Sequence, residues 1–300
     1  MEHKISNAEN SVEAATFFQS LSRQTLEVSA KLVKQARANA TGWVDDIAPN
    51  TVNKLGRDIP VEVLTEMTSL LNGELTDLEP YREAQLRELA FWRWVAYEGY
   101  VHLPPELFPL HQHHFMISSY LNSGWQINRF SEKRIFELGC GPLGMIEYLP
   151  AKSKVAFDPL NERYSELFAN YRNPEIRYLW DKQTLIDDDT RCDLAICHNV
   201  IDHTDDPAWW YNTMFDKLED GGEFLFQVNL SEPDVPQEED HKRMHPSPVK
   251  YEQADAWLKA KSDDYSFTRS DQPSTDGEFY FLAWGRKTKN DQITYENLLV

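Results

Sequence analysis

The stretch Arg134-Ile-Phe-Glu-Leu-Gly-Cys-Gly-Pro-Leu-Gly144 decides the fold that we predict for this chain. It joins an apolar run, suited to a buried strand, to a loop with glycines at positions 139, 141 and 144. Glycine lets a backbone turn sharply and approach a ligand closely, because it has no Cβ atom. This spacing alone does not identify a cofactor, since nicotinamide- and flavin-binding proteins share it.

Downstream of this loop, short β-like runs alternate with helical runs. We expect strands at 134–138, 154–157, 176–179, 192–197, 223–228, 265–269 and 278–286, and helices at 161–171, 207–218 and 248–261. The alternation predicts an α/β fold with a Rossmann-like, doubly wound, mostly parallel seven-stranded sheet. Only a loop separates the last two strands, so they could form an antiparallel hairpin at the sheet edge.

Upstream of the loop, the apolar residues follow helical spacing instead. We expect helices at 11–40, 60–71, 83–100 and 109–123. The sequence therefore predicts two regions. Residues 1–130 would form a helical cap that selects the substrate, and residues 131–300 would form the cofactor-binding α/β domain. We expect most aromatic residues of the cap to pack as a core against the sheet domain.

Composition narrows the class of partner. The formal net charge is −19 and the sequence pI is near 4.8, which argues against binding nucleic acid and favours a small molecule or a sugar as substrate. The cysteines Cys140, Cys192 and Cys197 form no CxxC pair and predict no disulfide framework. The first residues lack an apolar signal core, and no run approaches the ~20 apolar residues of a membrane span. These features predict a cytoplasmic protein.

Three further features narrow the choice of cofactor. Glu137 ends the first predicted strand, where an acid suits a cofactor with a positively charged amino group rather than a pyrophosphate. Asp158 ends the second predicted strand, where an acid can accept both ribose hydroxyls of an adenosine. The fourth predicted strand runs into 197–207, with the sequence CHNVIDHTDDP.

Taken in this order, the motifs resemble the class I S-adenosylmethionine (SAM)-dependent methyltransferases. The matching segments are 137–141, Asp158, Asp181, 198–207 and the turn at 219–222 before the fifth strand. The resemblance covers roughly the second half of the chain. It implies SAM as the cofactor and methyl transfer as the activity.

The resemblance also implies roles for single residues. Glu137 would hold the methionine amino group, Asp158 the ribose and Asp181 the adenine edge. One departure is Pro142-Leu143, where many family members have a smaller residue in the loop. The predicted cofactor-binding residues are Glu137, Gly139, Cys140, Gly141, Asp158, Pro159, Asp181, His198 and Asn199.

A shorter resemblance concerns the acceptor. Residues 157–160, followed by Tyr164, are similar to a subgroup found with bacterial surface-polysaccharide and sugar biosynthesis. It implies a small-molecule or glycan acceptor, and we expect methylation on oxygen. Two other functions stay open on the sequence: an NAD-dependent Rossmann oxidoreductase, and a non-catalytic SAM-fold protein that binds a partner.

Histidines after the fourth and fifth strands are the candidate bases. An acceptor that loses a proton needs a base within hydrogen-bond reach, and histidine titrates near neutral pH. Among family members, a histidine in the place of His245 often faces the acceptor, so His245 is our first candidate and His203 the second. His203 could instead be a packing residue of the cofactor pocket, and we expect His241 to be a solvated loop residue.

A second group of histidines, His111, His113 and His114, precedes the sheet domain. On a helix the first and last would share a face and could begin a metal site or contact a substrate. We favour an exposed polar turn beside Pro109 over a metal site, because no matching ligand spacing is visible. We therefore predict no metal.

Overall fold

The computed structural model describes residues 53, 55–99, 130–147, 149–232, 235, 237, 239–274 and 277–291. The predicted helices at 11–40 and 109–123 lie outside the described residues. So do His111, His113 and His114.

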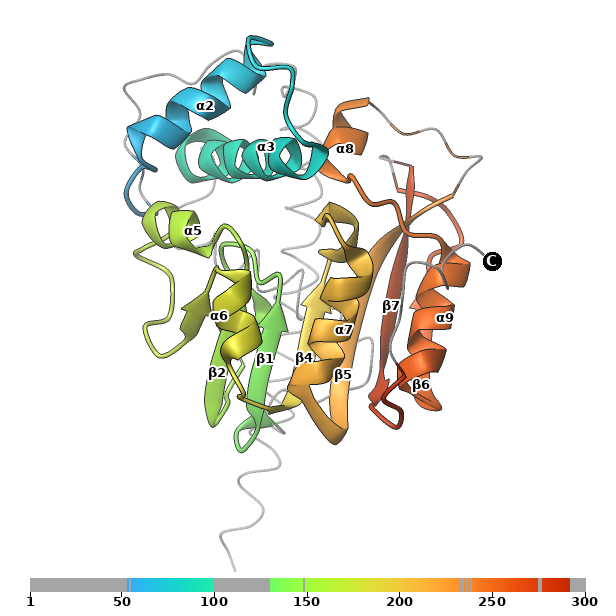
Figure 1. Cartoon of the computed structure of the whole chain (residues 1–300). Helices are drawn as coiled ribbons and strands as arrows, with labels where there is room; N and C mark the ends of the chain where they lie inside the picture. The colour runs from blue at the N-terminus through green and yellow to red at the C-terminus, as the bar shows by residue number, and fades with distance from the viewer. Residues whose placement is uncertain are drawn as a thin grey trace, which may run out of the picture.

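A single mixed sheet forms the centre of the described structure (Figure 1). Its strand order is β3-β2-β1-β4-β5-β7-β6, and β7 is antiparallel to both β5 and β6. The other neighbours pair in parallel. The strands are β1 (Arg134–Leu138), β2 (Ser153–Phe157), β3 (Arg177–Leu179), β4 (Cys192–His198), β5 (Leu218–Ser231), β6 (Asp264–Arg269) and β7 (Glu278–Arg286). The predicted fold, including the closing antiparallel hairpin, is confirmed.

The helices of the second half surround this sheet in two groups: in Figure 1, α6, α7 and α9 lie on one face, whereas α5 and α8 lie at the ends of the strands. They are α5 (Asn161–Leu167), α6 (Lys182–Asp187), α7 (Pro207–Lys217), α8 (Glu239–Met244) and α9 (Tyr251–Lys261). The short helices α6 and α8 were not predicted, because six residues leave too little room for an apolar period. Helix α5 ends four residues before the predicted 161–171.

Strand β5 begins earlier than predicted and includes the expected turn at 219–222. Leu218 pairs with Cys192, whereas Glu223 already pairs with Leu194, so the register shifts between these two points. The shift accommodates the turn inside one long strand.

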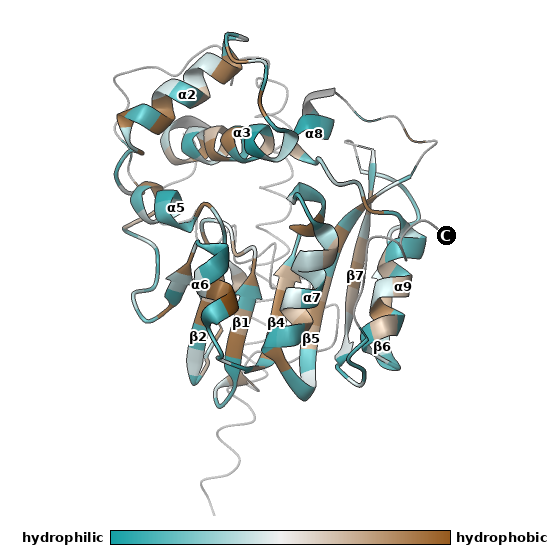
Figure 2. Cartoon of the chain, in the orientation of Figure 1, coloured by the Kyte–Doolittle hydropathy of each residue, from teal (hydrophilic) through white to brown (hydrophobic). Residues whose placement is uncertain are grey.

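Both faces of the sheet are buried, as a parallel sheet requires. Successive residues of β1 enter different clusters: Phe136 packs with Trp210 and Phe215 of α7, and Ile135 packs with Phe130 on the other face. Hydrophobic colour accordingly runs along the central strands in Figure 2. The three cysteines are buried and free.

Helices of the N-terminal region lie across the carboxyl ends of the strands (Figure 1). They are α2 (Val61–Leu71), confirming the prediction at 60–71, and α3 (Pro80–Trp94), which continues as a π-helical turn at Val95–Gly99. Their apolar residues share one cluster with Leu167 and Phe168 of the α/β region. The Asn53 side chain also donates to the carbonyl of Leu167, at 3.1 Å. The N-terminal helices are thus packed onto the sheet domain. Within the described residues, no helix combines the length and apolar character that crossing a bilayer needs.

Candidate active site

The glycine loop follows β1 and is held by two close approaches. Gly139 has φ +72°, and a Cβ there would overlap both Cγ atoms of Val200. A Cβ on Gly144 would likewise overlap Oε2 of Glu137. The loop therefore presses against the end of β4 on one side and against the strand that leads into it on the other.

Glu137 holds this loop from beneath. Its side chain is fully buried, and its two oxygens accept hydrogen bonds from the backbone N–H groups of Met145, at 3.0 Å, and Ile146, at 2.8 Å. Burial raises the pKa of Glu137 to about 8. Glu137 does not line the cavity, so the structure places it beneath the loop, apart from the other predicted cofactor residues.

We predict that Glu137→Ala lowers the free energy of unfolding by about 3 kcal/mol. Two buried N–H groups would lose their acceptor, and each such loss costs about 1–3 kcal/mol. Glu137→Gln should cost roughly half as much, because its single oxygen can still serve one N–H. Urea unfolding of the three proteins measures the order, and equal stability of Glu137→Ala and the wild type would contradict this role for Glu137.

Asp158 stands at the end of β2 beside the loop. It is 9% exposed, and it accepts hydrogen bonds from the backbone N–H groups of Gly141, at 3.0 Å, and Leu160, at 2.9 Å. Burial raises the pKa of Asp158 to about 6; nearby Glu88 adds to this shift and Arg172 opposes it. Asp158 and Pro159 both line the cavity described below, as a ribose-binding position requires.

Asp181 occupies a different environment from the one its motif implies. It is exposed and caps α6, accepting a hydrogen bond from the backbone N–H of Thr184 at 2.8 Å. This hydrogen bond lowers its pKa. Asp181 does not line the cavity, so the structure does not bring it together with the other predicted cofactor residues.

A cavity of about 260 Å³ opens between the carboxyl ends of β1, β2 and β4 and helix α3. All predicted cofactor residues except Glu137 and Asp181 line it: Gly139, Cys140, Gly141, Asp158, Pro159, His198 and Asn199. Such a position, outside the carboxyl ends of the strands, is where open α/β sheets bind ligands.

The opposite wall of the cavity comes from α3, a helix in which we predicted no site residue. It contributes Tyr81, Ala84, Gln85, Glu88 and Trp92. These residues recur every three or four positions, so they share one helix face. Gln85 and Glu88 are polar residues on this otherwise apolar face. They are the sequence signal that could have indicated contact with a ligand rather than only with a core.

The cavity fits a cofactor that carries hydroxyl and amino groups. Asn199 has φ +56°, and its buried Oδ1 has no hydrogen-bond partner among the described residues. Buried polar atoms are rarely left unsatisfied. Together with the Asp158 carboxylate and the Cβ-free loop, Asn199 offers acceptors to such a ligand. Burial lowers the pKa of neighbouring His198 to about 4, so its ring is neutral at physiological pH.

Glu88 and His203 form a polar pair within the cavity. His203 Nδ1 lies 3.8 Å from Glu88 Oε2, and Trp92 Nε1 donates to Glu88 Oε1 at 2.6 Å. Burial raises the pKa of Glu88 and lowers that of His203 to about 4. The buried Nε2 of His203 has no hydrogen-bond partner among the described residues.

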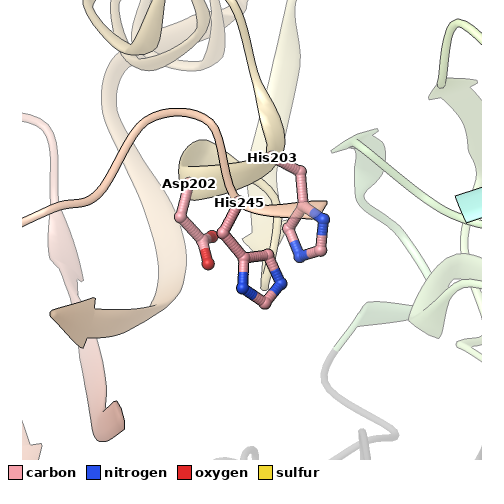
Figure 3. A group of neighbouring side chains, drawn as sticks. All are labelled: Asp202, His203 and His245. Carbon is pink, nitrogen blue, oxygen red and sulfur yellow. The ribbon is translucent and has the colours of Figure 1, made fainter. Parts of the chain in front are cut away.

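His245 sits behind His203 rather than in the cavity wall. The two rings are 4.1 Å apart between centroids, and Figure 3 shows Asp202 and His203 on either side of His245. The cavity wall includes His203 and Met244 but not His245. The cavity wall therefore contains our second candidate base, His203, and not the first, His245.

His241 is not the solvated loop residue we expected. Its side chain is 18% exposed, and Nε2 lies 2.8 Å from Glu278 Oε1. Burial alone would raise the pKa of Glu278, but hydrogen bonds and charge from His241 and His245 lower it to about 2.

Comparison with known proteins identifies the family. A family model described as a methyltransferase domain matches residues 111–262, more than half of the 300-residue chain, and the protein belongs to this family. It is a SAM-dependent methyltransferase, and SAM is its cofactor. The sequence matches no curated protein.

Solved structures with a similar fold include the N-methyltransferase NodS from Bradyrhizobium japonicum in complex with S-adenosylhomocysteine (SAH). The two share 17% identity with a TM-score of 0.47, over 70% of this chain and 99% of that one. A SAM-dependent methyltransferase from Mesorhizobium loti shares 14% identity with a TM-score of 0.42, over 56% of this chain and 96% of that one.

Proposed function

We propose that this methyltransferase methylates a hydroxyl group of a small molecule or sugar, and that the N-terminal helices select the acceptor. The observation that carries the proposal is the cavity between the strand ends and α3. Its cofactor side holds Asp158 and Asn199, and its α3 side adds Gln85 and Glu88 close to His203. A compact cavity with few polar groups suits a small acceptor or a terminal sugar unit.

SAM, when bound, supplies a methyl group already activated by its positively charged sulfur. The protein must then position the acceptor and exclude water. Helix α3 does both in this proposal, since its polar residues would orient the acceptor and Trp92 and Tyr81 would cover the site.

A hydroxyl acceptor must also lose a proton. We assign this proton to Nε2 of His203, a buried nitrogen without a protein partner among the described residues. His203 is neutral at physiological pH because burial lowers its pKa, so one of its ring nitrogens can accept a hydrogen bond. The neighbouring Glu88 carboxyl group would compensate the charge that His203 gains.

We predict that His203→Asn lowers kcat by about 100-fold, the usual lower range for loss of a general base. The dissociation constant for SAH should change less than about threefold, because the acceptor contact lies apart from Asp158 and the glycine loop. Release of SAH from SAM, measured with a panel of sugars and small alcohols and their amino analogues, identifies an acceptor on which to test this. Lys259→Ala, on the exposed face of α9, is the control variant.

Two results would contradict the proposal. Methylation of the amines but of none of the hydroxyl compounds would show that the acceptor atom is nitrogen. An unchanged kcat in His203→Asn, with an acceptor in hand, would remove His203 as the base.

A further inference from the structure

Behind the cavity, two histidines and a glutamate bring three ligand-type atoms together. His241 and His245 are four residues apart around the end of α8, and Glu278 is the first residue of β7. His245 Nδ1 lies 2.8 Å from His241 Nε2, and Glu278 Oε1 lies 2.8 Å from that same nitrogen and 3.3 Å from His245 Nδ1. The three atoms thus form a closed triangle.

With Glu278 ionised, no placement of the ring hydrogens makes every side of this triangle a hydrogen bond. The carboxylate oxygen can only accept, and each ring nitrogen either carries a hydrogen or offers a lone pair. If both nitrogens carry hydrogens, the contact between them joins two donors. If only one does, the other nitrogen and the oxygen face each other as two acceptors. A cation resolves the conflict, because all three atoms can then direct lone pairs at it.

The spacing of the three atoms also suits a metal ion. Nitrogen and oxygen ligands bind zinc at about 2.0–2.2 Å, which places neighbouring ligand atoms about 3.0 Å apart in octahedral and about 3.4 Å apart in tetrahedral geometry. The observed 2.8, 2.8 and 3.3 Å span this range. Two histidines and one carboxylate on one face of an ion form a known metal-binding arrangement that leaves other positions open.

Asp202 provides an independent sign of a ligand here. Its side chain is fully buried, yet neither carboxylate oxygen has a hydrogen-bond partner among the described residues. A ligand oxygen of Asp202 lies within 4.8 Å of ligand nitrogens of His203 and His245. Figure 3 shows its side chain beside that of His245. A buried carboxylate without a partner is costly, so something absent from the protein itself should satisfy it.

We propose that His241 Nε2, His245 Nδ1 and Glu278 Oε1 bind one divalent transition-metal ion. Water on an open position of the ion would give the Asp202 oxygens the partners they lack. Imidazole ligands favour zinc, copper, iron or nickel over magnesium and calcium. The ion would fix α8 against β7 and so hold Met244 in the cavity wall. This inference does not depend on the proposed acceptor, because metal binding is measured without turnover.

The test is titration of the metal-stripped, full-length protein with Zn²⁺ against a chromophoric chelator, and with Co²⁺ followed by visible absorption. We expect one Zn²⁺ per chain, and a Co²⁺ spectrum that shows nitrogen and oxygen ligands. His241→Ala and Glu278→Gln should each weaken Zn²⁺ binding at least tenfold, because even loss of an outer-shell partner typically costs about 10–100-fold. Lys242→Gln, an exposed neighbour on α8, should bind like the wild type.

Retained SAH binding and an unchanged circular dichroism spectrum show that each variant is folded, and the Co²⁺ spectrum of the wild type needs no variant. Absence of stoichiometric Zn²⁺ and of the Co²⁺ spectrum in the wild type would overturn the proposal. Unchanged Zn²⁺ affinity in both His241→Ala and Glu278→Gln would do so too, as would binding lost only when His111, His113 and His114 are replaced together.

Discussion

Gly139→Ala is expected to lower the free energy of unfolding by about 2–5 kcal/mol and to abolish measurable SAH binding. The φ angle of +72° costs an L-residue with a side chain about 1–2 kcal/mol. The added Cβ would also overlap both Cγ atoms of Val200 and lie 2.7 Å from its Cβ, and overpacking of this kind costs about 1–3 kcal/mol more. Relief of the overlap would move the loop that forms the cavity wall.

Gly73 offers a matched control for this prediction. It has the same φ of +72°, but a Cβ there would meet no atom within 4 Å. Gly73→Ala should therefore show only the backbone cost of about 1–2 kcal/mol and should bind SAH normally. Urea unfolding and calorimetric titration measure both quantities. Equal losses of stability in the two variants would mean that contact with Val200 does not shape the loop.

Asp158→Ala is expected to weaken SAH binding by about 100-fold. Two hydrogen bonds from ribose hydroxyls to a carboxylate, at about 1.5 kcal/mol each, amount to about 3 kcal/mol. Asp181→Ala is the matched control, because Asp181 is an acid from the same set of family motifs that lies outside the cavity. Its SAH affinity should stay within about twofold of the wild type. Weaker SAH binding in Asp181→Ala, with unchanged affinity in Asp158→Ala, would instead support the adenine-edge role of Asp181.

The pH dependence of SAH binding should follow from the same carboxyl group. Burial raises the pKa of Asp158 to about 6 in the ligand-free protein, so the group gains a proton as the pH falls through that value. A protonated carboxyl group accepts hydrogen bonds less strongly, so affinity should be full above pH 7 and fall below about pH 6. Asp158→Ala should lose this dependence between pH 5 and 8. A wild-type affinity that stays constant over that interval would contradict ribose binding by ionised Asp158.

The sheet could be predicted from the sequence because its signals are local. Each strand is a short apolar run, and the glycines of the loop indicate a backbone that turns sharply. The residues that line the cavity from this loop and from the ends of β2 and β4 follow directly from strand order, since parallel strands end at one edge. The structure does not place Glu137 and Asp181 in the cavity wall with the other predicted cofactor residues. Each stands at or just after the end of a strand, but the motif does not reveal whether its side chain points to the cavity, under the loop or to solvent.

The sequence could not predict the contacts between segments that lie far apart in the chain. Glu88 and His203 are far apart in the chain, and only the placement of α3 across the strand ends brings them together. Glu278 lies far from α8 in the sequence. It reaches His241 and His245 because β7 pairs with β5 in the sheet. The sequence favours His245 over His203 because His245 precedes the predicted helix at 248–261. It does not show which of the two rings faces the cavity.

A crystal structure of the protein with SAH tests the central claim most directly. We predict that the ribose hydroxyls of SAH contact the carboxylate of Asp158, and that the sulfur faces His203 and Glu88 under α3. SAH bound away from Asp158, or with its sulfur turned from α3 so that no acceptor could reach it from the cavity, would contradict the account.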